Sequence, residues 1–279
     1  MPQRPTDLTV QPTATTVDGN QSAPIYSRLD RTASALAETH TLRHENGSTT
    51  VGSSGAHVYL PSRLPDIAQR LRNAHQYLTT SVDEVVSVSY AAEWLLDNFY
   101  AVEQTLRQIE EDLPASYYRE LPKLSAPTSL VGFPRVYGVA RAFLIHEDYQ
   151  FDLERLVRFV LAYQQHMPLT MGELWAIPIM LRFVLLEDLA LAIQRITQVS
   201  REKRDEIDLL TARSESPAAT TPATPAIETT TTLEDPEIVA SCIPGLRALD
   251  TQDWKIFFER VSLVHQLLCD DPMDIYSEM

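Results

Sequence analysis

The sequence predicts an all-α protein: a multi-helix bundle of antiparallel helical hairpins around a buried central helix, with a disordered N-terminal tail and a Pro/Thr-rich linker. Apolar residues recur every three or four positions, and alternating apolar runs are few. Only eight residues are glycine. One stretch, residues 170–188, begins with a helix-start pattern and is apolar on nearly every face, which is typical of a helix enclosed by others.

Composition narrows the classes of function. The 279 residues allow one or two domains, and 44% of them are hydrophobic, which is enough for a core. A net charge of −15 argues against a surface that binds nucleic acid, because phosphates require clustered Lys and Arg. Cys242 and Cys269 form no CxxC pair, and we expect two reduced buried thiols. No basic and apolar leader opens the chain, so we expect a cytoplasmic protein.

Residues 1–59 are predicted to be a disordered tail, because Thr, Ser, Pro and Gly dominate and little apolar surface can be buried. Residues 28–43 have a weak apolar stripe and could form a transient helix. His40 and His44 stand four apart, as two metal ligands on a helix would. No third ligand accompanies them, so chance spacing is the favoured interpretation.

Residues 60–214 are predicted to form the helical bundle. Pro61 and Pro65 bracket the start of a first helix. A capping box of Ser81 and Glu84 opens what we expect to be the longest periodic helix, and Pro114 ends it. On its outer face, Glu103 and Arg107 have the spacing of a weak surface ion pair. Its inward positions alternate by three and four residues: Val85, Val88, Ala92, Leu95, Phe99, Val102, Leu106, Ile109 and Leu113.

A proline-rich connection follows, with a short helical turn expected at residues 117–119. Pro134 is expected at the first position of a helix that continues to His146. Asp152 is expected to cap the next helix, residues 152–166, so that the two form an antiparallel hairpin.

The central helix is predicted to begin with a capping box of Thr170 and Glu173. Arg182 interrupts its apolar run, which is therefore too short for a membrane span of about 20 residues. Pro178 is expected to kink the helix. Residues 215–234, rich in Pro and Thr, are predicted to be a flexible linker.

Residues 235–279 are predicted to be C-terminal helices, a truncated part of the same helical module. Pro244 falls early in the first, residues 238–249, and is expected to delay its start. Asp250 or Thr251 is expected to cap a last long helix that runs through residue 268. The final residues resemble the beginning of another helix.

No phosphate loop, zinc quartet or nucleophile elbow occurs in the sequence. Glu93 and Asp97 share a helical face and could act as an acid/base pair, although two solvated carboxylates are the favoured interpretation. Trp94 and Trp175 are expected in the core more than as carbohydrate platforms. A polar cluster is expected to tie loop to helix, with a substrate pocket as the alternative: Arg135, Tyr137, Arg141, His146 and Glu147.

Several long blocks resemble the N-terminal region of cyclic β-1,2-glucan synthases. They are residues 91–124, 132–164 and 168–189, together with the closing residues 253–279. The resemblance covers residues 64–279 apart from the linker. It implies a very large enzyme of the bacterial inner membrane that takes glucose from UDP-glucose, glucosylates its own chain as a primer, elongates a β-1,2-glucan and closes the ring.

The resemblance also implies that this segment lies on the cytoplasmic side of the inner membrane and is non-catalytic by itself. The transferase module, with its divalent metal and UDP-glucose, and the membrane modules are expected downstream in the same polypeptide and are the expected partners. No catalytic, cofactor-binding or metal-binding residue can be assigned in this segment, and no cofactor, nucleic-acid partner or direct membrane span is expected here. Tyr117 and Tyr118 are conceivable glucan acceptors, but nothing in the sequence singles them out.

Two alternatives stay open at this stage. The chain could be a stand-alone helical adaptor that binds a partner protein. A helical carbohydrate hydrolase ranks last, because such folds need more helices than the sequence supplies. If the chain is a truncated module of the synthase, the final helix around Phe257 and Phe258 is the expected docking face, because its partners would lie beyond the C-terminus.

Overall fold

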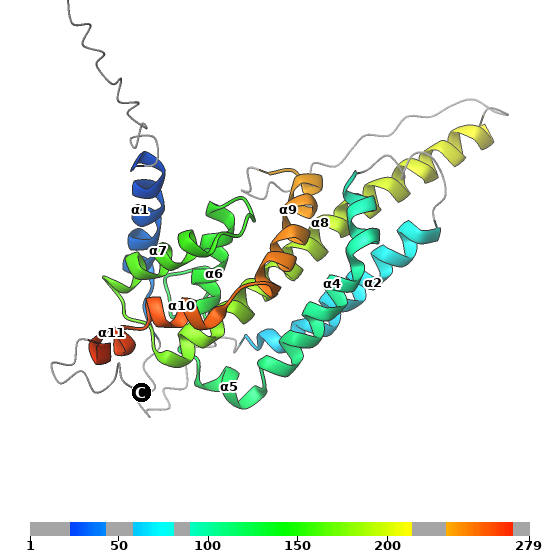
Figure 1. The fold of residues 1–279 in the computed structure, drawn as a ribbon. Helices are drawn as coiled ribbons and strands as arrows, with labels where there is room; N and C mark the ends of the chain where they lie inside the picture. The colour runs from blue at the N-terminus through cyan, green and yellow to red at the C-terminus, as the bar shows by residue number, and fades with distance from the viewer. Residues whose placement is uncertain (1–22, 43–57, 81–89, 214–232, 270–279) are drawn as a thin grey trace, which may run out of the picture.

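A computed structural model describes residues 23–42, 58–80, 90–213 and 233–269 of the protein. All regular secondary structure in these ranges is helical, and they contain no β-strand, so the predicted all-α fold class is confirmed (Figure 1). Within the same ranges, no helix is long and apolar enough to cross a membrane.

The central helix is α8, Met171–Arg213, which passes diagonally through the molecule (Figure 1). Its 43 residues make it longer than α4, Tyr90–Asp112, the helix expected to be longest. Pro178 lies inside it. The predicted capping box of Ser81 and Glu84 lies outside the described residues. Every residue of α8 from 176 to 190 is buried in the protein interior, which confirms the predicted enclosure.

Three helices cover one part of α8. They are α2 (Leu64–Thr80), α4 and α9 (Asp235–Asp250). A short 3-10 turn, η1 (Leu60–Arg63), leads directly into α2. Helix α9 packs extensively on both α8 and α4. The expected surface pair of Glu103 with Arg107 is replaced by a two-pronged pair, in which Arg72 of α2 donates to both Glu103 carboxylate oxygens at 2.8 and 2.9 Å.

The other part of α8 is covered by α6, Arg135–His146. Helix α7, Leu153–Gln164, follows it, and the predicted cap is confirmed, since Asp152 accepts a hydrogen bond from the Arg155 amide. The predicted helical turn in the preceding connection is also confirmed as α5, Ala115–Glu120. Helix α7 packs less against its hairpin neighbour α6 than against a third helix, α1.

Helix α1, Ala23–Thr39, corrects the prediction that residues 1–59 are a disordered tail. Its side chains at Leu29, Ala33 and Ala37 are buried against the rest of the protein. The weak apolar stripe of residues 28–43 is visible in the sequence. Its packing partner α7 lies far along the chain, so composition alone does not show that the helix is stable. The remaining tail, residues 1–22 and 43–57, lies outside the described residues.

His40 anchors the end of α1. Its Nδ1 atom lies 2.8 Å from the hydroxyl of Tyr163 in α7, and the ring is buried. His44, its proposed fellow metal ligand, lies outside the described residues. Burial and the nearby Arg135 guanidinium lower the pKa of His40 to about 4. The ring is therefore neutral in the folded protein near pH 7.

The C-terminal helices differ from expectation in their boundaries. Pro244 does not delay α9, which begins at Asp235 behind a capping box of Glu234 and Glu237. Asp253, not Asp250 or Thr251, caps α10, Trp254–Val261. The expected single last helix is broken at Ser262, where the backbone is extended, and α11, Leu263–Cys269, follows. The Ser262 hydroxyl accepts a hydrogen bond from the His265 amide, so this side chain restarts the helix.

We predict that α1 contributes to the stability of the bundle. Replacement of Leu29 by Ala removes a fully buried side chain and should lower the free energy of unfolding by about 2–5 kcal/mol, as measured by urea titration. The matched control Leu267→Ala alters a side chain that is 74% exposed, and it should change the free energy of unfolding by less than about 0.5 kcal/mol. Equal effects of the two substitutions would show that α1 is not part of the cooperative unit.

We also predict a pH dependence that His40 causes. The folded pKa of about 4 lies below the ordinary 6.5, so between these values the unfolded chain binds more protons. Stability from this group is complete above pH about 6.5 and declines as the pH falls towards 4. Urea titrations across that range should show a steeper decline for the wild type than for His40→Gln. Parallel pH profiles would contradict the assignment.

Candidate binding groove

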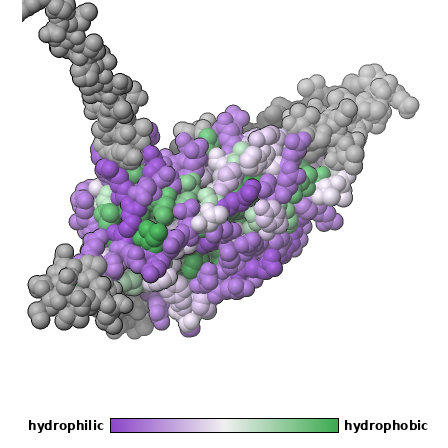
Figure 2. Space-filling model, viewed as in Figure 1, coloured by the Kyte–Doolittle hydropathy of each residue, from purple (hydrophilic) through white to green (hydrophobic). Residues whose placement is uncertain are grey.

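An aromatic-lined cavity of about 500 Å³ opens where the first turns of α8 meet α5 and α10. We call it the aromatic groove, and its lining comes from α4, α5, α8 and α10: Asp112, Tyr117, Gly172, Trp175, Pro178, Ile179, Arg182, Trp254 and Phe258. A second cavity of about 340 Å³ shares Trp175 and Phe258 with it and extends to α11. In the view of Figure 2 the surface is largely hydrophilic, with some hydrophobic patches.

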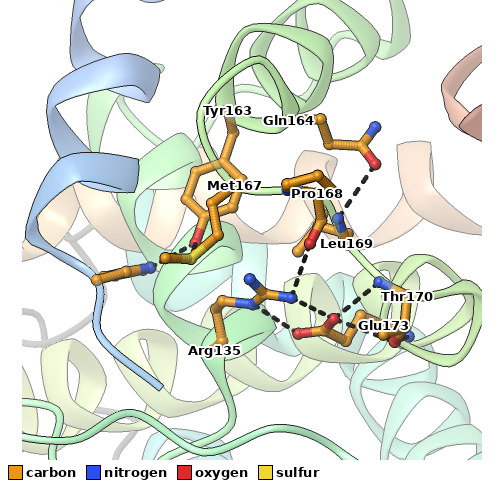
Figure 3. A network of polar contacts seen from close by, with 9 residues as sticks. Arg135, Tyr163, Gln164, Met167, Pro168, Leu169, Thr170 and Glu173 are labelled. Atoms are coloured by element: carbon orange, nitrogen blue, oxygen red, sulfur yellow. Dashed lines mark hydrogen bonds and ion pairs between the residues drawn. The ribbon is translucent and has the colours of Figure 1, made fainter.

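The first turn of α8, which carries Gly172 and Trp175, is fixed by the predicted capping box. The Thr170 amide donates to the Glu173 carboxylate at 2.9 Å, and the Glu173 amide donates to the Thr170 hydroxyl at 3.2 Å. Arg135 of α6 donates from Nε to the same carboxylate at 2.7 Å and from Nη2 to the Pro168 carbonyl at 3.1 Å (Figure 3). Arg135 and Glu173 are both buried, so this turn is held rigidly from two sides.

Tyr117 closes one wall of the aromatic groove. Its hydroxyl donates to the Gly172 carbonyl at 2.6 Å. Burial raises the pKa of Tyr117 to about 12, so the hydroxyl stays protonated and keeps this bond at physiological pH. Tyr118, its neighbour in α5, donates to the Val58 carbonyl at 2.7 Å. Both tyrosines named as conceivable acceptors thus have their hydroxyl groups engaged.

Trp175 corrects one sequence prediction. It is 54% exposed and therefore not a core residue, whereas Trp94 packs against the core as expected. The Trp175 ring lies over Phe258, with ring centroids 3.6 Å apart. A helix that is apolar on every face does not reveal which face its neighbours leave open, so the sequence could not place this indole. Trp254 borders the same cavity and donates from its indole nitrogen to the Leu249 carbonyl at 3.1 Å.

Arg182 forms the polar part of the groove lining. It is only 8% exposed, and its Nη2 atom makes long contacts with the Leu249 carbonyl at 3.4 Å and with Asp250 at 3.3 Å. Its buried Nε atom has no hydrogen-bond partner within the described part of the chain. Buried donors are almost always paired in folded proteins, so this unpaired donor is an exception in the groove lining.

The polar cluster of α6 is a structural network, as favoured over a substrate pocket. Tyr137 donates to Glu187 at 2.5 Å, and Arg141 contacts Asp188 at 3.2 Å. Burial and the neighbouring Glu187 carboxylate raise the pKa of Tyr137. The other members of the predicted cluster are also engaged: Glu147 accepts from Arg155 at 2.7 Å, and His146 lies 3.4 Å from the Thr32 hydroxyl.

The remaining candidate groups lie on α4, α9 and α11. Glu93 and Asp97 are exposed on α4, as solvated carboxylates would be. Cys242 is free and buried, and burial raises the pKa of its thiol. The side chain of Cys269 is not described. Across the described ranges, no three His, Cys, Asp or Glu side chains are grouped so that they could hold a metal ion.

We predict that the pair of Arg135 and Glu173 is the dominant polar contact behind the groove. Arg135→Met leaves a buried carboxylate without its partner and should lower the free energy of unfolding by about 3–5 kcal/mol in a urea titration. The matched control Arg72→Met breaks a more exposed pair with Glu103 and should lower it by less than about 1 kcal/mol. Comparable losses would contradict the ranking of the two pairs.

Comparison with known proteins gives one informative similarity. No family model matches the chain. The chain is 32% identical over 145 residues to "Cyclic beta-(1,2)-glucan synthase NdvB" of Rhizobium meliloti (strain 1021). The aligned residues are 51% of this chain and 5% of that protein, so the chain corresponds to a small part of the relative's length. The resemblance inferred from the residue blocks is therefore confirmed: about half of this chain is similar to a segment of a cyclic β-(1,2)-glucan synthase.

Proposed function

We propose that this chain is the N-terminal cytoplasmic helical segment of a cyclic β-1,2-glucan synthase, and that it acts by binding the remaining modules of the enzyme. The similarity to the synthase of Rhizobium meliloti over 145 residues supports the family assignment. In this proposal the remaining modules supply the transferase chemistry, with UDP-glucose and a divalent metal. The segment lies at the inner membrane through those modules.

The arrangement of charged side chains supports a non-catalytic role. The buried carboxylates of α8 each have a structural partner: Glu173 binds Arg135, Glu187 binds Arg63 and Tyr137, and Asp188 binds Arg141 and Tyr149. A general acid or base needs a carboxylate that can reach a substrate proton. These carboxylates are committed to holding helices together.

The observation that carries the proposal is an apolar face on α11. Val264 is 56% exposed, Leu267 is 74% exposed and Leu268 is 44% exposed, and their spacing places them on one side of the helix. Apolar stripes at this spacing are how helices dock into one another. We call Leu263, Val264, Leu267 and Leu268 the α11 face, and we assign to it the transferase or membrane modules of the synthase as partner.

The α11 face replaces the docking face expected from the sequence. Phe257 is fully buried and Phe258 is 7% exposed, so both belong to the core of the bundle. The expectation was wrong because α10 and α11 are two helices, whereas the sequence predicts one. The break at Ser262 lets α10 pack inward while α11 turns its leucines outward. Phe258→Asp should therefore unfold the bundle, and it is unsuitable as a test of docking.

We predict that Leu267→Asp weakens association of the chain with the separately produced remainder of a synthase polypeptide by at least about tenfold, because a charge enters an apolar contact. Biolayer interferometry measures the affinity, and circular dichroism should show unchanged helicity. The matched control Tyr100→Asp alters a side chain of α4 that is similarly exposed and should leave the affinity unchanged.

Two outcomes would contradict the proposal. Equal binding by Leu267→Asp and the wild type would remove the α11 face as the contact, and absence of any binding to synthase modules would favour the stand-alone adaptor. A labelled-glucose assay tests the non-catalytic part separately. Transfer from UDP-glucose onto the isolated chain in the presence of Mg²⁺ would overturn that part while leaving docking open.

A further inference from the structure

The aromatic groove has the shape and lining of a small-ligand site. Its volume of about 500 Å³ falls within the usual range of about 300–1,000 Å³ for such sites. Tyr117, Trp175, Trp254 and Phe258 reach it from three different helices. More than half of the Trp175 side chain is exposed, although one face rests on Phe258. The groove thus presents a rigid aromatic surface on which a flat apolar face can stack.

Arg182 determines what such a ligand must offer. Its charge is already balanced by Asp250 at 3.3 Å, but its buried Nε atom has no partner in the described residues. Because Arg182 lines the cavity, a ligand that fills the groove can present a hydrogen-bond acceptor to this guanidinium and does not need a full negative charge. A purely apolar occupant would leave the donor unpaired.

The surrounding charges disfavour an ionic ligand. Asp112 lines the groove, Asp250 lies beside Arg182, and the whole chain carries a net charge of −15. An anion is repelled by these carboxylates, and a cation would meet the Arg182 guanidinium. A neutral molecule with hydroxyl groups avoids both penalties, because hydroxyls can accept from Arg182 and donate to Asp112.

We propose that the aromatic groove binds a neutral pyranose sugar. One C–H face of the ring stacks on Trp175, and its hydroxyl groups bond to Arg182 and Asp112. A pyranose combines an apolar face with a rim of neutral donors and acceptors, which is the combination that this lining requires. The site is distinct from the docking role of the α11 face, and the proposed function enters only in the choice of linkage for the first probe, a β-1,2-linked glucose disaccharide.

The test is a titration of the full 279-residue chain with that disaccharide, followed by tryptophan fluorescence and by isothermal calorimetry. We expect saturable binding in the millimolar range. Trp175→Ala should weaken it at least about tenfold, and Trp175→Phe, which keeps an aromatic face, less than about threefold. Arg182→Lys keeps the charge beside Asp250 but lacks the Nε donor, and should weaken binding about five- to tenfold. Tyr100→Ala, an exposed aromatic control on α4, should have no effect.

Probe chemistry provides a second comparison. Glucose 6-phosphate should bind more weakly than the neutral disaccharide, because its phosphate meets Asp112 and Asp250. Asp112→Asn should narrow the difference in affinity between the two probes, because it removes one of the carboxylates that repel the phosphate. Tighter binding of the phosphate than of the disaccharide would overturn the neutral-ligand assignment.

Other results would overturn the site itself. No saturation by about 50 mM disaccharide would do so, since such affinity is negligible. Undiminished binding in Trp175→Ala would place the sugar elsewhere. Displacement of bound sugar by an apolar helical peptide would assign the groove to protein docking. Leu267→Asp separates this inference from the proposed function, because it should weaken docking at least about tenfold and leave sugar binding intact.

Discussion

The need to cover α8 on every side dictates the rest of the structure. The side chains from Ala176 to Ile193 are nearly all buried, and a helix that is apolar all round is stable in water only when other helices enclose it. Burial alone does not say which helix covers which side. The four charged residues between Glu173 and Asp188 make that choice, because each meets a specific partner: Glu173 meets Arg135, Arg182 meets Asp250, Glu187 meets Arg63, and Asp188 meets Arg141.

Local signals in the sequence were sufficient for much of the fold. The caps at Thr170 and Asp152 were predictable because a cap is made by residues three positions apart. Helix α1 was predicted only as a transient helix in a disordered tail, for the opposite reason. It is ordered by contacts with α7, including the ion pair of Asp30 with Arg158 at 2.7 Å. A local sequence pattern cannot predict a packing partner that is so distant in the sequence.

The candidate groove was less predictable than the fold. In the sequence, Arg182 was visible only as an interruption of an apolar run, and Trp175 was expected in the core more than as a carbohydrate platform. Their significance arises from α10, which brings Trp254 and Phe258 beside them. The break at Ser262 likewise depends on a serine that serves as a helix cap, because its hydroxyl accepts from the His265 amide. Position in a helix can be read from spacing, whereas exposure depends on the neighbouring elements.

The groove and the α11 face lie at the same end of the bundle, and this gives them a physical relation. Trp175 and Phe258 line both the aromatic groove and the cavity that reaches α11. A partner seated on the α11 face therefore borders the indole on which a ligand would stack. Because the buried pair of Arg135 and Glu173 fixes the turn that carries Trp175, the indole is pre-organised before either partner arrives, so binding at one side need not order the other.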